Sequence, residues 1–187
     1  MKKVIIPIIE SEMLNIGAIK ASKSLYYYRT KNNLVNIIVD VNFDSRRKRV
    51  VFNTAFDLNL NLENAVVLFD NKQFIFDIND ILVLDKAIKE FLPDVLNDFS
   101  QKIEKYEDIN NVILFFENAK FPDIWYDYYL YVLFVLLNRQ EKLQLLKKKI
   151  LSRESISPWM ADLLKEVEIM DINRANNIVL LNSNKFG

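Results

Sequence analysis

The chain has 187 residues, of which 51% are hydrophobic, and this length and composition predict a single domain spanning residues 1–187 with a sizeable core. Basic and acidic side chains number 25 each, whereas a protein that neutralises nucleic acid phosphates normally carries a basic excess, so nucleic acid is not expected as a partner. The absence of Cys and His excludes disulfides, thiolate nucleophiles and the commonest general base, and 2 glycines are too few for the familiar phosphate-binding loops.

The first predicted element is a helix. Apolar residues recur every three or four positions between residues 4 and 16, and Gly17 follows where a left-handed C-cap residue belongs. Because Pro7 fits only the first turn of a helix, we expect the helix to begin near Ile6. The apolar run that ends at Glu10 is shorter than that of a secretory signal, and a chain without Cys suits a reducing compartment, so we expect a cytoplasmic protein.

The period of the apolar pattern then changes to two, which is typical of strands. Three strands rich in Val, Ile, Phe and Tyr are predicted at residues 19–29, 34–43 and 50–60, separated by turn-prone segments. A further hairpin is predicted from residues 65–69 and 74–78, with residues 70–73 as its turn. Together these segments predict an antiparallel meander sheet of four or five strands.

Helical spacing of apolar residues dominates from residue 80 onward, and Pro93 is expected to kink or split the first helix. The later helices are expected to start at Asp108, Pro122, Gln140, Ser157 and Asp171. The sheet-rich half 1–79 and the helical half 80–187 predict an α+β fold, with an N-terminal helix and a C-terminal helical layer packed on one sheet face.

The most apolar stretch is PDIWYDYYLYVLFVLL, residues 122–137. It is shorter than the roughly 20 residues that a membrane span needs, so no transmembrane segment is predicted. On a helical wheel its aromatic and aliphatic side chains cover a broad arc, which favours a core helix over an aromatic platform for a cofactor or carbohydrate. Asp127, Tyr131 and Asn138 share the remaining narrow arc, either as an internal polar network or as a rim to solvent.

The opening helix with its terminal glycine is followed by NIGAIKASKSLYYYRTKNNLVNIIVDVNFD and VVFNTAFDLN, and then by FLPDVLNDF and YEDINNVILFFEN. This order of segments, over about residues 5–150, resembles a bacterial family of small, mostly uncharacterised α+β proteins. Some members of that family look like immunity or accessory partners of secreted toxins. The resemblance implies that the chain binds another protein, and it brings no catalytic residues.

One candidate contact surface is the face of the sheet expected to meet solvent. In the tightest register, with Phe43 opposite Val50 and Arg29 opposite Leu34, three cross-strand rows result. They are Lys23, Asp40 and Asn53, then Leu25, Ile38 and Ala55, and then Tyr27, Asn36 and Asp57. A strip with polar ends and a small apolar middle suits a peptide or protein partner. The alternative is an ordinary half-exposed sheet with a Lys23–Asp40 pair.

The second candidate surface is the basic run Arg46, Arg47, Lys48 and Arg49, which fills a predicted hairpin turn. Such runs commonly keep strand edges from pairing with other chains. The alternative is an anchor for an acidic partner surface, because Arg binds carboxylates with two parallel hydrogen bonds.

An enzyme that uses carboxylates with Lys is the alternative functional class. A magnesium nuclease of this kind would draw on Asp57, Asp70 and Lys72, but Asp70 and Lys72 fall in a predicted turn. No catalytic residue, metal site or cofactor is predicted. We therefore expect a non-enzymatic bacterial protein-binding domain, with an immunity-like role as its candidate form and a helical oligomerisation adaptor as a third possibility; the oligomeric state stays open.

Overall fold

A computed structural model describes residues 2–60, 66–78, 83–119, 123–153 and 158–183 of the chain. Over these ranges the protein is α+β, as predicted: an N-terminal helix, an antiparallel sheet of five strands and six further helices. The contacts between residues divide the chain into two compact units. The prediction of a single domain stays a prediction.

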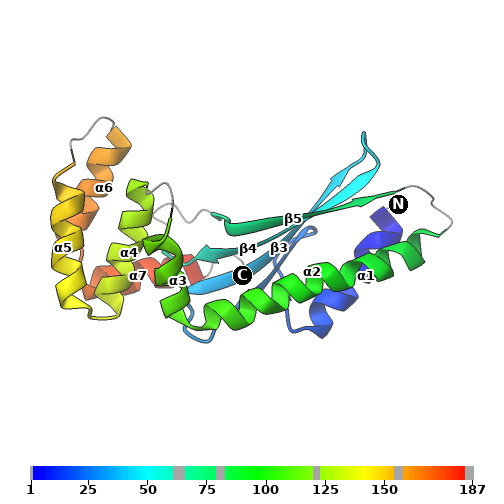
Figure 1. Ribbon diagram of the computed structural model, residues 1–187, viewed down its shortest axis with the longest axis horizontal. Helices are drawn as coiled ribbons and strands as arrows, with labels where there is room; N and C mark the ends of the chain where they lie inside the picture. Colours follow the sequence, from blue (N-terminus) through cyan, green and yellow to red (C-terminus); the bar gives the residue numbers. More distant parts are fainter. Residues whose placement is uncertain (1, 61–65, 79–82, 120–122, 154–157, 184–187) are drawn as a thin grey trace. The chain divides into compact units, whose positions relative to one another are not determined.

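The first unit, called the sheet unit below, holds all the strands and two helices (Figure 1). Its elements are α1 (Lys2–Asn15), β1 (Ile19–Lys20), β2 (Leu25–Arg29), β3 (Val35–Asp44), β4 (Arg49–Leu58), β5 (Phe69–Asp77) and α2 (Leu84–Glu107). The second, the helical unit, holds α3 (Ile109–Glu117), α4 (Ile124–Leu136), α5 (Gln140–Leu151), α6 (Pro158–Ile169) and α7 (Ile172–Ser183). The sequence grouped α2 with the later helices, whereas the structure places it in the sheet unit.

Helix α1 ends as its sequence predicts. Gly17 has φ +82°, the amide of Gly17 donates to the carbonyl of Leu14, and the amide of Ala18 donates to the carbonyl of Met13. This pair of bonds is a Schellman motif, which satisfies carbonyls that the last turn leaves free. The predicted start near Ile6 is wrong, because α1 begins at Lys2 and contains Pro7. The Pro7 nitrogen cannot donate a hydrogen bond within the helix, and α1 packs against α2 and β1.

The strands form a meander in the order β1-β2-β3-β4-β5. The predicted register between β3 and β4 is confirmed, with Phe43 opposite Val50. The register between β2 and β3 differs from the prediction by two residues, because Arg29 lies opposite Asn36 instead of Leu34.

The longer turn between β2 and β3 causes this shift. The amide of Thr30 donates to the carbonyl of Val35 at 3.0 Å, so the turn takes up residues 31–34. Within it the side chain of Asn32 accepts from the amide of Leu34 at 2.9 Å, and Asn33 adopts φ 59°. Asn tolerates this left-handed conformation, and the side-chain acceptor stabilises the turn.

Two strand predictions are corrected by the structure. Residues 19–29 form two short strands, β1 and β2, which pair with each other. The predicted hairpin with a turn at residues 70–73 is wrong, because these residues belong to the continuous strand β5, while residue 65 of that hairpin lies outside the described ranges. Polar residues suit β5 since it lies at the edge of the sheet, where one side of the strand is free of a partner strand.

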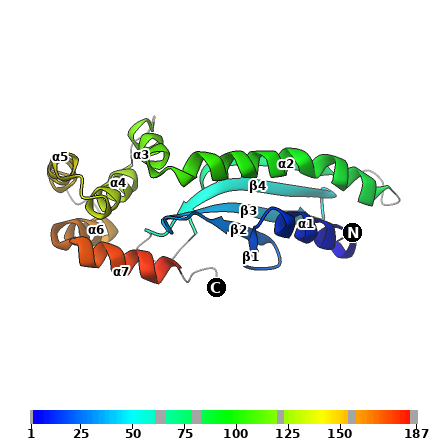
Figure 2. The same cartoon turned by 90° about the horizontal axis from the view of Figure 1, so that it is seen from below.

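Helix α2 covers one face of the sheet (Figure 2) and contains Pro93 without being split by it. Phe52 and Phe56 of β4 point to this helix, where they meet the rings of Phe91 and Tyr106 at centroid distances of 5.7 and 4.3 Å. The predicted helical layer on one sheet face is therefore made by α2. This packing places the polar side chains of α2 directly over β4 and β5.

Helix α4 lies at the centre of the helical unit, in contact with α3, α5, α6 and α7. Its side chains between Tyr128 and Val135 are buried, which confirms that it is a core helix. The predicted caps at Asp108 and Asp171 are also confirmed, since their carboxylates accept from the amides of Asn110 and Arg174. The expected helix starts at Pro122 and Ser157 lie outside the described residues.

No helix in the described ranges has the length and apolar content needed to cross a membrane.

Candidate functional site

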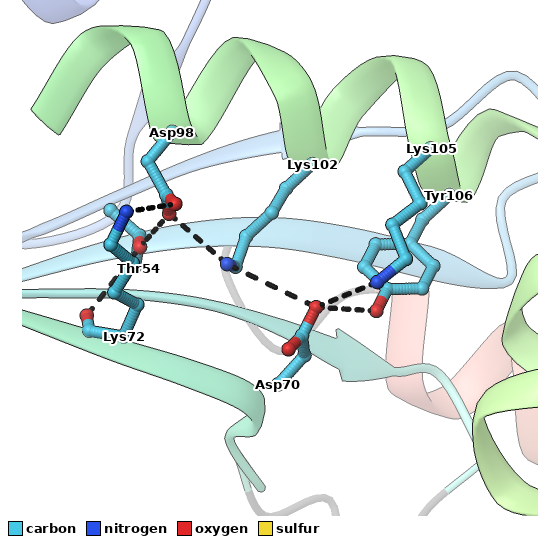
Figure 3. A network of polar contacts seen from close by, with 7 residues as sticks. All are labelled: Thr54, Asp70, Lys72, Asp98, Lys102, Lys105 and Tyr106. Carbon is cyan, nitrogen blue, oxygen red and sulfur yellow. Dashed lines mark hydrogen bonds and ion pairs between the residues drawn. The ribbon is translucent and has the colours of Figure 1, made fainter. Parts of the chain in front are cut away.

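A network of charged and polar side chains links α2 to β4 and β5 (Figure 3). Its members are Thr54, Asp70, Lys72, Asp98, Lys102, Lys105 and Tyr106. All of them belong to the sheet unit. Six of the seven side chains are titratable, and the seventh, Thr54, contributes a hydroxyl.

Asp98 is the centre of one half of the network. Its carboxylate accepts hydrogen bonds from the ammonium groups of Lys72 and Lys102, each at 3.0 Å, and from the hydroxyl of Thr54. Burial favours the neutral acid and raises the pKa of Asp98, but the three donors outweigh burial and hold that pKa below 3.8. Asp98 is therefore ionised at neutral pH although it is nearly inaccessible to solvent.

Asp70 is the centre of the other half. Its Oδ2 accepts from the hydroxyl of Tyr106 at 2.6 Å and from Lys105 at 3.1 Å, and it lies 4.0 Å from the ammonium of Lys102. Burial raises the pKa of Asp70, yet the two hydrogen bonds and the nearby lysines lower it on balance. Because Lys102 also binds Asp98, its ammonium bridges the two carboxylates.

The local backbone explains why these groups meet. Positions 98, 102 and 106 are four residues apart, so they share one face of α2. Thr54 lies opposite Lys72 in the pairing of β4 with β5. A register irregularity between Thr54 and Phe56 coincides with a positive φ of 49° at Asp70, and this bulge lets the Asp70 side chain reach α2.

The ion pairs of this network join α2 to the sheet, and the network is called the clamp below. Each carboxylate is neutralised by lysines, and no group of three or more His, Cys, Asp or Glu in the described ranges could hold a metal ion. A carboxylate site for magnesium would need oxygen ligands turned toward a shared point. Here Lys102 occupies the space between the two carboxylates, as Figure 3 shows.

The trio considered for a magnesium nuclease is not assembled. Asp70 and Lys72 lie on a strand, contrary to the predicted turn. However, Thr54 and Phe56 face α2, so Asp57 points to the opposite face of β4. There its carboxylate accepts from the amide of Val67 at 2.9 Å. The sheet itself therefore separates Asp57 from the other two residues.

Acid should weaken the clamp. Because the pKa values of Asp70 and Asp98 are depressed in the folded state, their stabilisation is present above the unfolded pKa and is lost as the pH falls through the folded pKa. We expect the melting temperature to fall steadily from about pH 5 to about pH 2 and to fall less steeply for Asp70→Asn, as measured by circular dichroism. The control Asp94→Asn, at an exposed position of α2, should keep the parent slope, and equal slopes for both variants would contradict the argument.

The face of the sheet that was expected to meet solvent is only partly exposed. Tyr27, Asn36 and Asp57 are buried, Asp40 and Asn53 are half-buried, and Lys23 is exposed just before β2. The expectation of a solvent-facing strip is therefore wrong at Tyr27, Asn36 and Asp57.

A second apolar cluster explains the burial of Tyr27. Tyr27 packs on Ile38 with Ala21 and Leu25 around them, so the middle of this face forms a small core of its own. The two-residue shift in register also places Arg29, in place of Tyr27, in the row of Asn36 and Asp57. The expected Lys23–Asp40 cross-strand pair is replaced by Leu25 opposite Asp40.

The basic run lies at the turn between β3 and β4. Arg46, Arg47 and Lys48 are exposed, and Arg49 is half-buried as the first residue of β4. Asp44 organises the turn, because its carboxylate accepts from the amide of Arg47 at 3.1 Å and lies 3.3 Å from the guanidinium of Arg49. In Figure 1 this hairpin tip twists away from α2.

The three residues of the polar arc predicted for α4 do not share one environment. Asp127 and Tyr131 are buried, whereas Asn138 is exposed beyond the helix end. The carboxylate of Asp127 accepts from Lys149 at 2.8 Å and from Arg153, so this buried carboxylate is paired with two partly exposed cations. Burial raises the pKa of Tyr131.

Sequence reasoning missed the clamp between α2 and the sheet. A usable signal was present, because Asp98 and Lys102 stand four residues apart beside the apolar stripe that contains Val95, Phe99 and Tyr106. Opposite charges at that spacing on a buried helix face indicate paired groups, since an unpaired buried charge is strongly disfavoured.

Comparisons of the chain with models of protein families, with curated proteins and with solved structures gave no match. The resemblance to the bacterial family with immunity-like members therefore stays a prediction.

Proposed function

We propose that the protein works by binding another protein and that the β3–β4 tip, Arg46 to Lys48, contacts an acidic surface of that partner. The supporting observation is the exposure of three consecutive basic side chains on a hairpin that extends away from α2. Arg presents its guanidinium to carboxylates in a bidentate geometry and is enriched at interface hot spots. An immunity-like role in a bacterial cell is the candidate biological form of this proposal.

The tip is preorganised for such a contact. The backbone amide of Arg47 binds the carboxylate of Asp44, and Lys48 already adopts the positive φ of 48° that the turn requires. The hydrogen bond from Arg47 and the charges of Arg49 and Arg47 lower the pKa of Asp44, so the carboxylate that organises the turn is ionised. A turn that is ordered before binding loses less conformational entropy in the complex.

The proposal is tested by crosslinking from the tip in the native cell. A photoreactive phenylalanine derivative at Ser45 should capture one partner in a stoichiometric complex, which mass spectrometry identifies. The double change Arg46→Glu and Arg47→Glu should then weaken the affinity of the purified pair by at least about tenfold, because like charges would meet at the interface.

The matched control reverses two charges elsewhere in the sheet unit. Lys86 and Lys89 are exposed on α2, where they pair with Glu90 and Asp85, so Lys86→Glu with Lys89→Glu changes the net charge by the same amount. This control variant should bind the partner with the affinity of the parent chain. A clean absence of crosslinks, or an affinity unchanged by the reversal at Arg46 and Arg47, would refute the proposal.

A helical oligomerisation adaptor is the second candidate. It is favoured by apolar side chains that the helical unit leaves exposed, Leu145, Ile169, Leu180 and Leu181. Sedimentation analysis of the purified chain separates the candidates, since an adaptor of this kind forms a stable homo-oligomer without a partner.

A further inference from the structure

The helical unit contains a groove that the sequence did not indicate. Helices α6 and α7 run in different directions from the short connection between them, as Figures 1 and 2 both show. The groove has a volume of about 500 Å³, within the range of ligand-binding clefts. Each helix lines it with residues spaced by three and four: Trp159, Asp162, Leu163 and Glu166 from α6, and Arg174, Asn177, Ile178 and Leu181 from α7, with Trp125 of α4 beside them.

An ion pair is part of the groove lining. The guanidinium of Arg174 donates to both carboxylate oxygens of Glu166, and the Nε to Oε2 distance is 2.6 Å. The buried hydroxyl of Tyr128 has no hydrogen-bond partner among the residues that the structure describes. Burial, and next the charge of Glu166, raise the pKa of Tyr128, so this hydroxyl is neutral beside the pair.

Aromatic and apolar side chains also line the groove. The rings of Trp125 and Trp159 are stacked, with centroids 5.7 Å apart and planes 8° from parallel. Trp159 is 47% exposed and Leu181 is 69% exposed. Trp and Arg are the residue types most enriched at binding hot spots, and large exposed apolar side chains that gather at a groove mark interaction sites.

The charge of the lining selects the occupant. The lining carries two carboxylates, Asp162 and Glu166, and one guanidinium, Arg174, which is already held by Glu166. The carboxylate of Asp162 lies 3.7 Å from the ammonium of Lys165, and both side chains are about three quarters exposed. Because such an exposed ion pair is weak, a competing cation displaces Lys165 from Asp162 at little cost. A cation placed over an indole face gains further attraction from the ring quadrupole.

We propose that this groove binds a segment of a partner protein that presents a basic side chain between apolar ones. The basic group would lie over Trp159 and near Asp162, and the apolar side chains would cover Leu163, Ile178 and Leu181. This inference rests on the proposed function, because it assumes that the protein works by binding another protein. It adds a second surface, of opposite charge to the β3–β4 tip, and specifies the chemistry that this surface recognises.

The experiment exploits the two tryptophans of the chain, which both line the groove. The full chain labelled with 5-fluorotryptophan gives fluorine NMR signals that report on the groove alone. The probe is an amphipathic helical peptide of about 15 residues built from Leu and Arg, and its neutral isostere carries citrulline at every Arg position. The Arg peptide should shift the signals saturably, with an affinity at least about tenfold higher than that of the citrulline peptide.

Two variants locate the binding. Trp159→Leu keeps an apolar side chain at a half-exposed position, and Asp162→Asn removes one charge at an exposed position, so both should fold. Each should lower the affinity for the Arg peptide by about threefold to tenfold. The Trp125 signal is the readout for the first variant. Equal binding of the two peptides, no saturable shift, or affinity unchanged in both variants would overturn the inference.

Two further outcomes separate this inference from the proposed function. The Arg46→Glu and Arg47→Glu variant should bind the Arg peptide as the parent chain does. If this variant loses the native partner but still binds the peptide, the groove remains a binding site in its own right. Fluorine shifts that depend on protein concentration without peptide, and that disappear in the Arg46→Glu and Arg47→Glu variant, would show that the tip of a second copy occupies the groove. That result would overturn the inference in its present form.

Discussion

Replacing Lys102 by Met should lower the free energy of unfolding of the sheet unit by about 3–5 kcal/mol. The Lys102 side chain is 8% exposed, and its ammonium lies 3.0 Å from Asp98 and 4.0 Å from Asp70. Met keeps much of the side-chain volume, so the change removes the charge and leaves two carboxylates short of a counter-ion. Breaking a buried pair by removing one partner is far more costly than replacing the whole pair.

The matched control for this variant is Lys105→Met. Lys105 also binds Asp70 but is 50% exposed, so its loss should cost less than about 1 kcal/mol. Combining Lys102→Met with Asp98→Leu should recover part of the lost stability, since the charge left behind is then removed as well. Amide hydrogen exchange in β4 and α2 measures all three, and equal protection in the Lys102 and Lys105 variants would contradict the clamp.

Replacing Phe56 by Ala should lower the free energy of unfolding of the sheet unit by a similar amount, about 3–5 kcal/mol. Phe56 is 0% exposed, and its ring packs against Phe69 at 5.3 Å and Tyr106 at 4.3 Å. The smaller side chain leaves a cavity beneath α2. It also removes the packing that holds Tyr106 where its hydroxyl can donate to Asp70.

A control on the other face of the sheet tests whether this cost comes from the core under α2. Ile75 of β5 is 43% exposed, so Ile75→Ala should cost less than about 1 kcal/mol, measured by the same hydrogen exchange. A loss for Phe56→Ala no larger than for Ile75→Ala would show that Phe56 is not central to the packing of α2. The double variant Phe56→Ala with Tyr106→Phe should be less destabilised than the sum of its parts, because the two side chains touch.

The sequence alone determined the features that depend on neighbouring residues. Gly17, Asp108 and Asp171 marked helix ends because the signals are a left-handed backbone and a carboxylate within reach of nearby amides. The β3–β4 register was predictable because the alternation on both strands and a short turn leave one pairing that keeps apolar residues on one face. The core character of α4 followed from an apolar arc too wide for a surface helix.

Tertiary structure decided what depends on partners far away in the sequence. Residues 70–73 carry turn-forming residue types, yet pairing with β4 extends them, because long-range hydrogen bonds outweigh local preference. Tyr27, Asn36 and Asp57 alternate like solvent-facing residues but are buried, since alternation separates two faces without showing which one is covered. The clamp around Lys102 and the groove at Trp159 needed the packing of separate elements, because the distances between residues 54, 70 and 98, or 125, 159 and 174, are set by the fold. Only the spacing of Asp98 and Lys102 on α2 was visible in the chain itself.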